Sequence, residues 1–135
     1  MVETLPGLES GTIEPAPQDH SQATLAPILT KEDGRMDFVR AGVELLNRMR
    51  GFRSWPGSFT TFRGKNMQVH RAEPAQPGGE SQPGALIVNG HRLVVACGQG
   101  TALNLLEIQL DGKRRMTAQE FINGYHPKPG ERLGE

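Results

Sequence analysis

The sequence predicts a mainly β domain of the α+β class, built as a small barrel with one early helix and a short C-terminal helix. A chain of 135 residues has the length of one domain. Its 17 glycines and 10 prolines, with a hydrophobic fraction of only 36%, favour short strands joined by many turns. Apolar runs of strand length, separated by turn residues, fill residues 58–110.

The first 34 residues show no sustained hydrophobic period and predict an extended linker. Each proline in this stretch restricts the preceding residue to extended conformations. Residues Val2–Leu5 have the character of the last turn of a helix that Pro6-Gly7 ends. A helix end with no helix before it predicts that the chain begins inside a longer protein.

The first clear helix is predicted from about Arg40 to Arg50. Its apolar stripe, at helical spacing, consists of Val39, Val43, Leu46 and Met49. Asp37 is a candidate N-cap, and Glu44–Arg48 is a favourable i,i+4 pair. Gly51 suits a C-cap. The stripe is expected to be the face that packs on the rest of the domain.

Five strands are predicted in the region that follows. They cover residues 58–63, 67–72, 85–88, 92–97 and 102–110. Asn89-Gly90 is a strong hairpin signal, and Gly98-Gln99-Gly100 is a turn. Residues 73–84 contain nothing able to build a core and predict a mobile surface loop. Five short strands with one early helix indicate a barrel of Greek-key or OB-like character.

A capping box opens a short final helix. Thr117 and Glu120 provide the S/T-x-x-E pattern, and Phe121 and Ile122 provide the buried face. Asn123-Gly124 is expected to end the helix.

Several classes of function are excluded by composition. No apolar run approaches the roughly 18 residues of a membrane span, and the N-terminus lacks a signal peptide, so a soluble cytoplasmic protein without a membrane partner is expected. Cys97 is the single cysteine and is read as a small core residue. The four histidines lack the spacing of a metal site, and no phosphate-binding glycine motif is present.

Charge is distributed unevenly although the formal net charge is zero. Residues 1–34 hold six acids and one base, which leaves the remainder basic. The triplet Lys113-Arg114-Arg115 lies just before the final helix, where backbone amides attract anions and cations oppose the helix dipole unless a phosphate or an acid answers them. The triplet is therefore either a solvated loop or a phosphate-binding surface. Further cations that could extend such a surface are Arg53, Arg63, Lys65 and Arg71.

Several motifs, in one order, resemble the C-terminal part of the methionyl-tRNA formyltransferase family. They are Ala26–Arg35 (APILTKEDGR), Asn47–Gly51 (NRMRG), Trp55–Thr60 (WPGSFT), Lys113–Phe121 (KRRMTAQEF) and Pro129–Gly134 (PGERLG). The resemblance covers essentially the whole chain. It implies that residues 1–11 are the end of an N-terminal formyltransferase domain, 12–35 an extended linker, and 36–135 an OB-like C-terminal tRNA-binding domain.

The family transfers a formyl group from 10-formyltetrahydrofolate to the methionyl amino group of initiator tRNA. Its His-x-Ser-Leu-Leu-Pro catalytic signature does not occur here, so the resemblance implies no catalytic residue, no metal, no cofactor bound by this chain and no activity of the chain alone. The implied partners are initiator methionyl-tRNA and the N-terminal catalytic domain, with the chain itself a monomer. The implied tRNA-binding residues are Lys113, Arg114, Arg115, Lys31, Arg35, Arg63 and Lys65.

Three alternatives stay open. Other folate-dependent formyltransferases share the linker, helix and Trp55-Pro56-Gly57 region, although the KRRMTAQEF segment favours the tRNA enzyme. The chain could also be an inert truncated remnant, or half of an enzyme that works only when a catalytic domain is supplied.

Overall fold

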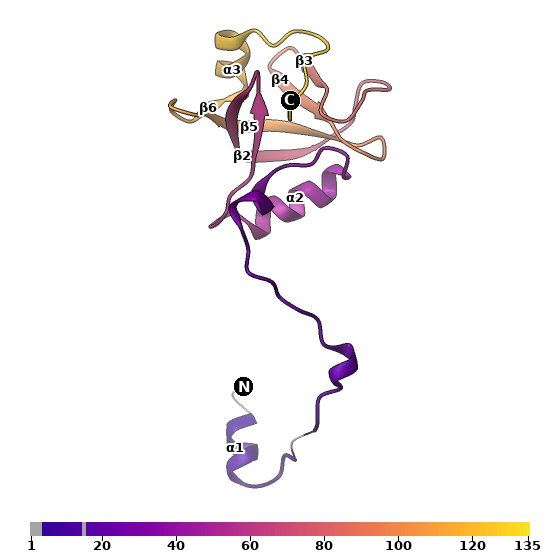
Figure 1. The fold of residues 1–135 in the computed structure, drawn as a ribbon, viewed down its shortest axis with the longest axis vertical. Coiled ribbons are helices and arrows are strands. Elements are labelled where there is room, and N and C mark those ends of the chain that lie inside the picture. The colour runs from indigo at the N-terminus through magenta and orange to yellow at the C-terminus, as the bar shows by residue number, and fades with distance from the viewer. Residues whose placement is uncertain (1–3, 15) are drawn as a thin grey trace.

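The computed structural model describes residues 4–14 and 16–135, and its main body is one curled antiparallel sheet with helices at its ends (Figure 1). The elements are α1 (Thr4–Glu9), η1 (His20–Gln22), η2 (Lys31–Gly34), α2 (Gly42–Gly51), β1 (Phe59–Phe62), β2 (Lys65–Ala75), β3 (Leu86–Asn89), β4 (Arg92–Ala96), β5 (Ala102–Leu110), β6 (Met116–Thr117) and α3 (Ala118–Tyr125). The mainly β, α+β class is confirmed.

The strand order of the sheet is β1-β2-β5-β4-β3, with β6 beside β5. Strands β3, β4 and β5 are consecutive neighbours, and the long connection from β2 to β3 leaves β2 on the far side of β5. Strands β3, β4 and β5 are joined by hairpins, and β2, joined to β3 by a long connection, lies beside β5. This arrangement of four strands is a Greek key. The Greek-key part of the expectation therefore holds, and the OB-like description stays a prediction.

Residues 131–134 join the two edge strands of the sheet. The amide of Gly134 donates to the Thr61 carbonyl of β1 (3.0 Å), and the amide of Leu86 in β3 donates to the Glu131 carbonyl (2.8 Å). Between these two bonds the Leu133 amide donates to the Gly84 carbonyl (2.8 Å). The C-terminal segment therefore fills the gap between β1 and β3 and completes the barrel.

The core lies inside the curled sheet. Phe62 of β1 contacts Phe121 of α3 edge to face, with ring centroids 5.0 Å apart, and Tyr125 stacks on Phe121 at the same distance. Cys97 is 3% exposed among these apolar side chains, as expected for a core residue, and burial raises the pKa of its thiol to about 11. Figure 1 shows α2 and α3 at opposite ends of the sheet.

The prediction of the buried face of the first helix is wrong for its first two residues, Val39 and Val43. Val39 and Val43 are 72% and 65% exposed, while Leu45 is buried. The buried face follows Gly42, Leu45, Leu46 and Met49, an i, i+3, i+4, i+7 series. Gly42 belongs to it because a Cβ there would lie 3.2 Å from the Ala102 carbonyl oxygen, so a side chain at this position would push the helix and β5 apart by a few tenths of an ångström.

The expected capping and pairing of this helix are also corrected. Helix α2 begins at Gly42, whose amide is capped by the hydroxyl of Thr101 (2.8 Å), so Asp37 is not the N-cap. Glu44 pairs with Arg40 instead of Arg48. Arg48 is free to donate to the Asp33 carbonyl (2.8 Å), which ties the linker end to the helix. A tertiary partner, Thr101, replaces the expected cap, whereas Glu44 pairs with the arginine four residues before it and not with the one four residues after it.

The lead-in is exposed along its described length up to Glu32, apart from the half-buried Gly7. Helix α1 runs from Thr4 through Pro6-Gly7 to Glu9, so the expected helix end at Pro6-Gly7 is wrong. Proline is tolerated there because it lies in the first turn. Val2 and Glu3, which belong to that expectation, lie outside the described residues.

Two further boundaries differ from expectation. Strand β2 continues to Ala75, into the predicted loop 73–84, because β5 is long enough to pair with it there. Helix α3 runs through Asn123-Gly124 to Tyr125, and His126 adopts the left-handed C-cap conformation (φ 47°). Among the described residues, no helix is both long and apolar enough to span a lipid bilayer.

Candidate nucleic-acid interface

A groove of about 820 Å³ lies between η2, α2 and the turn after it, β2, and the segment that precedes β6. Five cations line it, namely Lys31, Arg50, Arg53, Arg71 and Arg115. Glu107 is the one carboxylate among the lining residues. We call this concave surface the basic groove. Its excess of positive charge in a hollow suits a polyanion.

Lys31 reaches the basic groove because η2 is held against the barrel. Asp33 closes a capping box by accepting from the Thr30 amide (2.6 Å), and this hydrogen bond is the main reason that the pKa of Asp33 is lowered. Arg48 holds the Asp33 carbonyl, and the Met36 amide donates to the Phe59 carbonyl of β1 (2.8 Å). The linker end is thus a fixed wall of the groove.

A bulge in β2 brings two consecutive residues into the same groove. Val69 pairs with Ile108 and Arg71 with Glu107, and the register shifts on either side of Arg71. Consecutive strand residues normally point to opposite faces, but a bulge re-aims side chains and adds a residue. As a result His70 and Arg71 both line the basic groove.

His70 links the groove to the strand beneath it. Its Nδ1 lies 3.1 Å from Arg115 Nη2, and its Nε2 lies 3.0 Å from Gln109 Oε1. A guanidinium only donates, so Nδ1 must accept and Nε2 carries the hydrogen that is donated to Gln109. The Gln109 amide in turn donates to the Lys113 carbonyl (2.8 Å). This chain of contacts orients Arg115.

The sequence-predicted triplet is divided by the structure. Only Arg115 lines the basic groove. Arg114 pairs with Glu120 (2.7 Å), so an acid inside the chain answers the cation at the helix N-terminus. Lys113 is exposed in the turn after β5. The groove therefore includes one member of the triplet, and Lys113 and Arg114 are not among its lining residues.

The remaining predicted residues are also dispersed. Arg63, at φ 48° in the β1–β2 turn, donates to both carboxylate oxygens of Glu131 (2.8 and 3.0 Å) and to the Tyr125 carbonyl (3.1 Å). Arg63 thus fixes the C-terminal segment to the turn between β1 and β2. Lys65 begins β2 beside it, and Arg35 lines a different hollow. Lys31 and Arg115 are the two members of the predicted set that line the groove.

Arg53 and Arg71 are predicted from the sequence as possible extensions of a basic surface, and Arg50 as the end of the first helix. The structure places all three in the groove. Arg50 was missed because its position at the end of the helix already had a structural explanation in the helix dipole.

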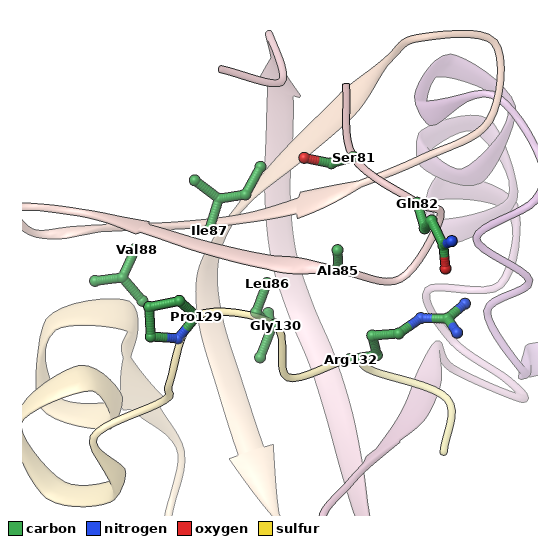
Figure 2. A pocket seen from close by; sticks show the side chains of 9 residues that line it. All are labelled: Ser81, Gln82, Ala85, Leu86, Ile87, Val88, Pro129, Gly130 and Arg132. Atoms are coloured by element: carbon green, nitrogen blue, oxygen red, sulfur yellow. The ribbon is translucent and has the colours of Figure 1, made fainter. Parts of the chain in front are cut away.

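A second hollow, of about 470 Å³, lies between residues 81–88 and the C-terminal segment (Figure 2). Arg132 is the one cation among its lining residues, and it is engaged by the Pro83 carbonyl (2.8 Å) and Glu135 (2.7 Å). Most of the other lining side chains are small or apolar, as Figure 2 shows for Ile87, Val88 and Pro129. The basic groove is therefore the stronger candidate for an anionic ligand.

No cluster of three or more His, Cys, Asp or Glu side chains in residues 4–14 and 16–135 is arranged to hold a metal ion.

Comparisons with known proteins agree on one family. The protein-family model described as formyl transferase, C-terminal domain, matches residues 28–126 of this chain. Proteins named methionyl-tRNA formyltransferase from Koribacter versatilis and Acidobacterium capsulatum are 53% and 50% identical over 99% of this chain. The chain spans 42% and 43% of their lengths. A crystal structure of HypX from Aquifex aeolicus matches 96% of this chain and 23% of its own with a TM-score of 0.60, and at 16% identity this likeness shows the fold alone.

Proposed function

Because the chain belongs to the formyl transferase C-terminal domain family, we propose that it is the tRNA-binding domain of a methionyl-tRNA formyltransferase and that initiator methionyl-tRNA binds in its basic groove. The observation that carries this proposal is the gathering of five cations from separate parts of the chain around one concave surface with a single carboxylate. Phosphates of an RNA backbone are the partner that such a surface attracts.

The binding is expected to position the RNA and not to read its sequence. The groove offers guanidinium and ammonium groups, which contact phosphates, and its lining aromatic rings are only those of Phe59 and His70, the second of which is held by Arg115 and Gln109. Recognition of initiator tRNA in particular is therefore assigned to the rest of the protein.

The formyl transfer itself belongs to the proposal for the whole protein, since this chain spans about two fifths of the length of its relatives. We assign 10-formyltetrahydrofolate and the catalytic groups to a partner domain and none of them to the residues of this chain. Other folate-dependent formyltransferases remain the second candidate. The relatives named methionyl-tRNA formyltransferase favour the first.

A titration with initiator tRNA at roughly 50 and 200 mM salt tests the proposal, because each lost phosphate contact lowers the salt slope by about one. The double variant Lys31→Ala/Arg53→Ala should bind more weakly with a slope reduced by about two. The matched control Arg92→Ala/Lys128→Ala removes the same charge outside the groove and should keep the wild-type slope.

A third double variant, Lys113→Ala/Arg114→Ala, separates the groove from the triplet predicted from sequence. If this variant loses affinity and the groove variant does not, the tRNA lies over the final helix and the groove is the wrong site. Absence of salt-dependent binding by the folded wild-type chain would remove the proposal altogether.

A further inference from the structure

Two arginines from distant parts of the sequence meet at one carboxylate inside the basic groove. Arg71 Nη1 lies 3.7 Å from Glu107 Oε1, and Arg115 Nη1 lies 3.5 Å from Glu107 Oε2. A charge-assisted hydrogen bond would be about 2.7–2.9 Å long. Both ion pairs are thus loose, and the arginine side chains are 68% and 57% exposed.

Other arginines of the chain are engaged much more closely. Arg114 lies 2.7 Å from Glu120, and Arg63 lies 2.8 Å from Glu131. These two cations are committed to partners within the chain. Arg71 and Arg115, in contrast, keep donors available to a ligand.

We propose that Arg71 and Arg115 form a phosphate subsite of the basic groove and that Glu107 occupies this subsite in the free protein as an internal competitor. A phosphodiester of an RNA backbone has two free anionic oxygens, as a carboxylate does, and would displace Glu107 from both guanidinium groups. The inference rests on the proposed function for the polymer to which that phosphate belongs.

Displacement of Glu107 would not release Arg115. The His70 ring holds Arg115 through Nδ1 at 3.1 Å, and Gln109 holds the His70 ring through Nε2 at 3.0 Å. Arg115 is therefore oriented by neutral groups that do not compete for phosphate. The Glu107 side chain is 33% exposed, so its carboxylate can turn toward water when an RNA phosphate enters.

The competitor has a consequence for selectivity. A carboxylate between two arginines weakens the attraction of the groove for any single small anion by Coulomb repulsion. A polymer that brings several phosphates to Lys31, Arg50 and Arg53 at once can still bind. Glu107 would thus favour extended RNA over free phosphate.

The test is the isosteric variant Glu107→Gln, with an unstructured RNA dodecamer as the probe and binding measured by fluorescence anisotropy at low salt. Affinity should rise roughly two- to fivefold, the range expected when one exposed charge pair is removed. Glu44→Gln is the matched control, because Glu44 also pairs with an arginine but lies outside the groove, and it should bind as wild type does. Arg71→Ala placed in the Glu107→Gln background should abolish the gain.

Unchanged or weaker binding of the dodecamer by Glu107→Gln, with an unaltered melting temperature, would overturn the inference. Glu107 would then be a residue that only positions the two arginines. Initiator tRNA is titrated in parallel. Tighter dodecamer binding without groove-dependent tRNA binding would leave the subsite standing and remove the proposed function. Loss of tRNA binding in Lys31→Ala/Arg53→Ala without any gain in Glu107→Gln would support the proposed function and remove the subsite.

Discussion

Gly98 shows how a single residue places a whole helix. Its amide hydrogen lies between two acceptors, the carbonyls of Phe38 (2.8 Å) and Arg40 (2.9 Å), on the segment that leads into α2. A Cβ at this position would lie 1.8 Å from the Val39 carbonyl oxygen, so any side chain here would force the backbone to move. This close approach holds the segment that leads into α2 against the turn between β4 and β5.

Gly98→Ala should therefore lower the free energy of unfolding by about 3 kcal/mol, since the clash is with backbone atoms that cannot rotate away. Gly124→Ala is the matched control. A Cβ there meets nothing within 4 Å, and alanine in helix α3 should raise stability by up to about 1 kcal/mol. Urea denaturation of both variants measures the difference, and similar stabilities would show that the 38–41 segment yields easily.

At the scale of the element, helix α3 illustrates local capping reinforced by a cation just before the helix. The Thr117 hydroxyl accepts from the Glu120 amide (3.2 Å), and Glu120 accepts from the Thr117 amide (2.8 Å). The hydrogen bond from the Thr117 amide, followed by that from Arg114, holds the pKa of Glu120 at about 2, well below its usual 4.5. The helix start is therefore tied to the ionised form of one carboxyl group.

The sign of the resulting pH dependence follows from this lowered pKa. The stabilisation by Glu120 is fully present above its ordinary pKa of 4.5 and is lost as the pH falls toward about 2. Glu120→Gln should thus melt at a lower temperature than wild type at pH 7, and the gap should close progressively below pH 4.5. Glu80→Gln, in the loop after β2, makes the same charge change and should show no gap at either pH. A gap that persists at pH 2 would mean that packing, and not the ionised carboxylate, is responsible.

On the scale of the whole molecule, the barrel is completed by a segment far from its partners in sequence. Leu133 is 3% exposed in the core. The backbone of residues 131–134 forms hydrogen bonds with Thr61, Gly84 and Leu86. Arg63 holds the same segment through Glu131. The pKa of Glu131 is lowered chiefly by this hydrogen bond with Arg63. Residues 131–134 are thus part of the barrel wall.

Leu133→Ala should destabilise the fold by about 3 kcal/mol, as expected for a buried leucine whose removal leaves a cavity. Leu25→Ala removes the same atoms from a side chain that is 96% exposed and should leave stability unchanged. Thermal and urea unfolding distinguish the two. Equal stability of both variants would mean that the C-terminal segment only rests on the barrel.

Much of the fold could be predicted because its signals are local. The strands coincide with runs of alternating or apolar residues, and the capping box at Thr117–Glu120 marked the start of α3 in advance. The candidate site was less accessible to such reasoning. The sequence predicts one basic surface for Lys113, Arg114 and Arg115, but only Arg115 lines the groove, and Arg114 pairs with Glu120.

Periodicity, turn residues and caps in the sequence were enough to establish the α+β class, the order of the strands along the chain and a basic character for the residues after 34. These features depend on residues a few positions apart, which favour one local conformation without any contact from distant parts of the chain. The buried face of α2 depended on Gly42 meeting Ala102 and Leu103, and the groove depended on a bulge that turns His70 and Arg71 to one side. Both are contacts between segments distant in the sequence. Only the tertiary structure decides which of them form, because their free energy arises from packing and charge placement across the folded barrel.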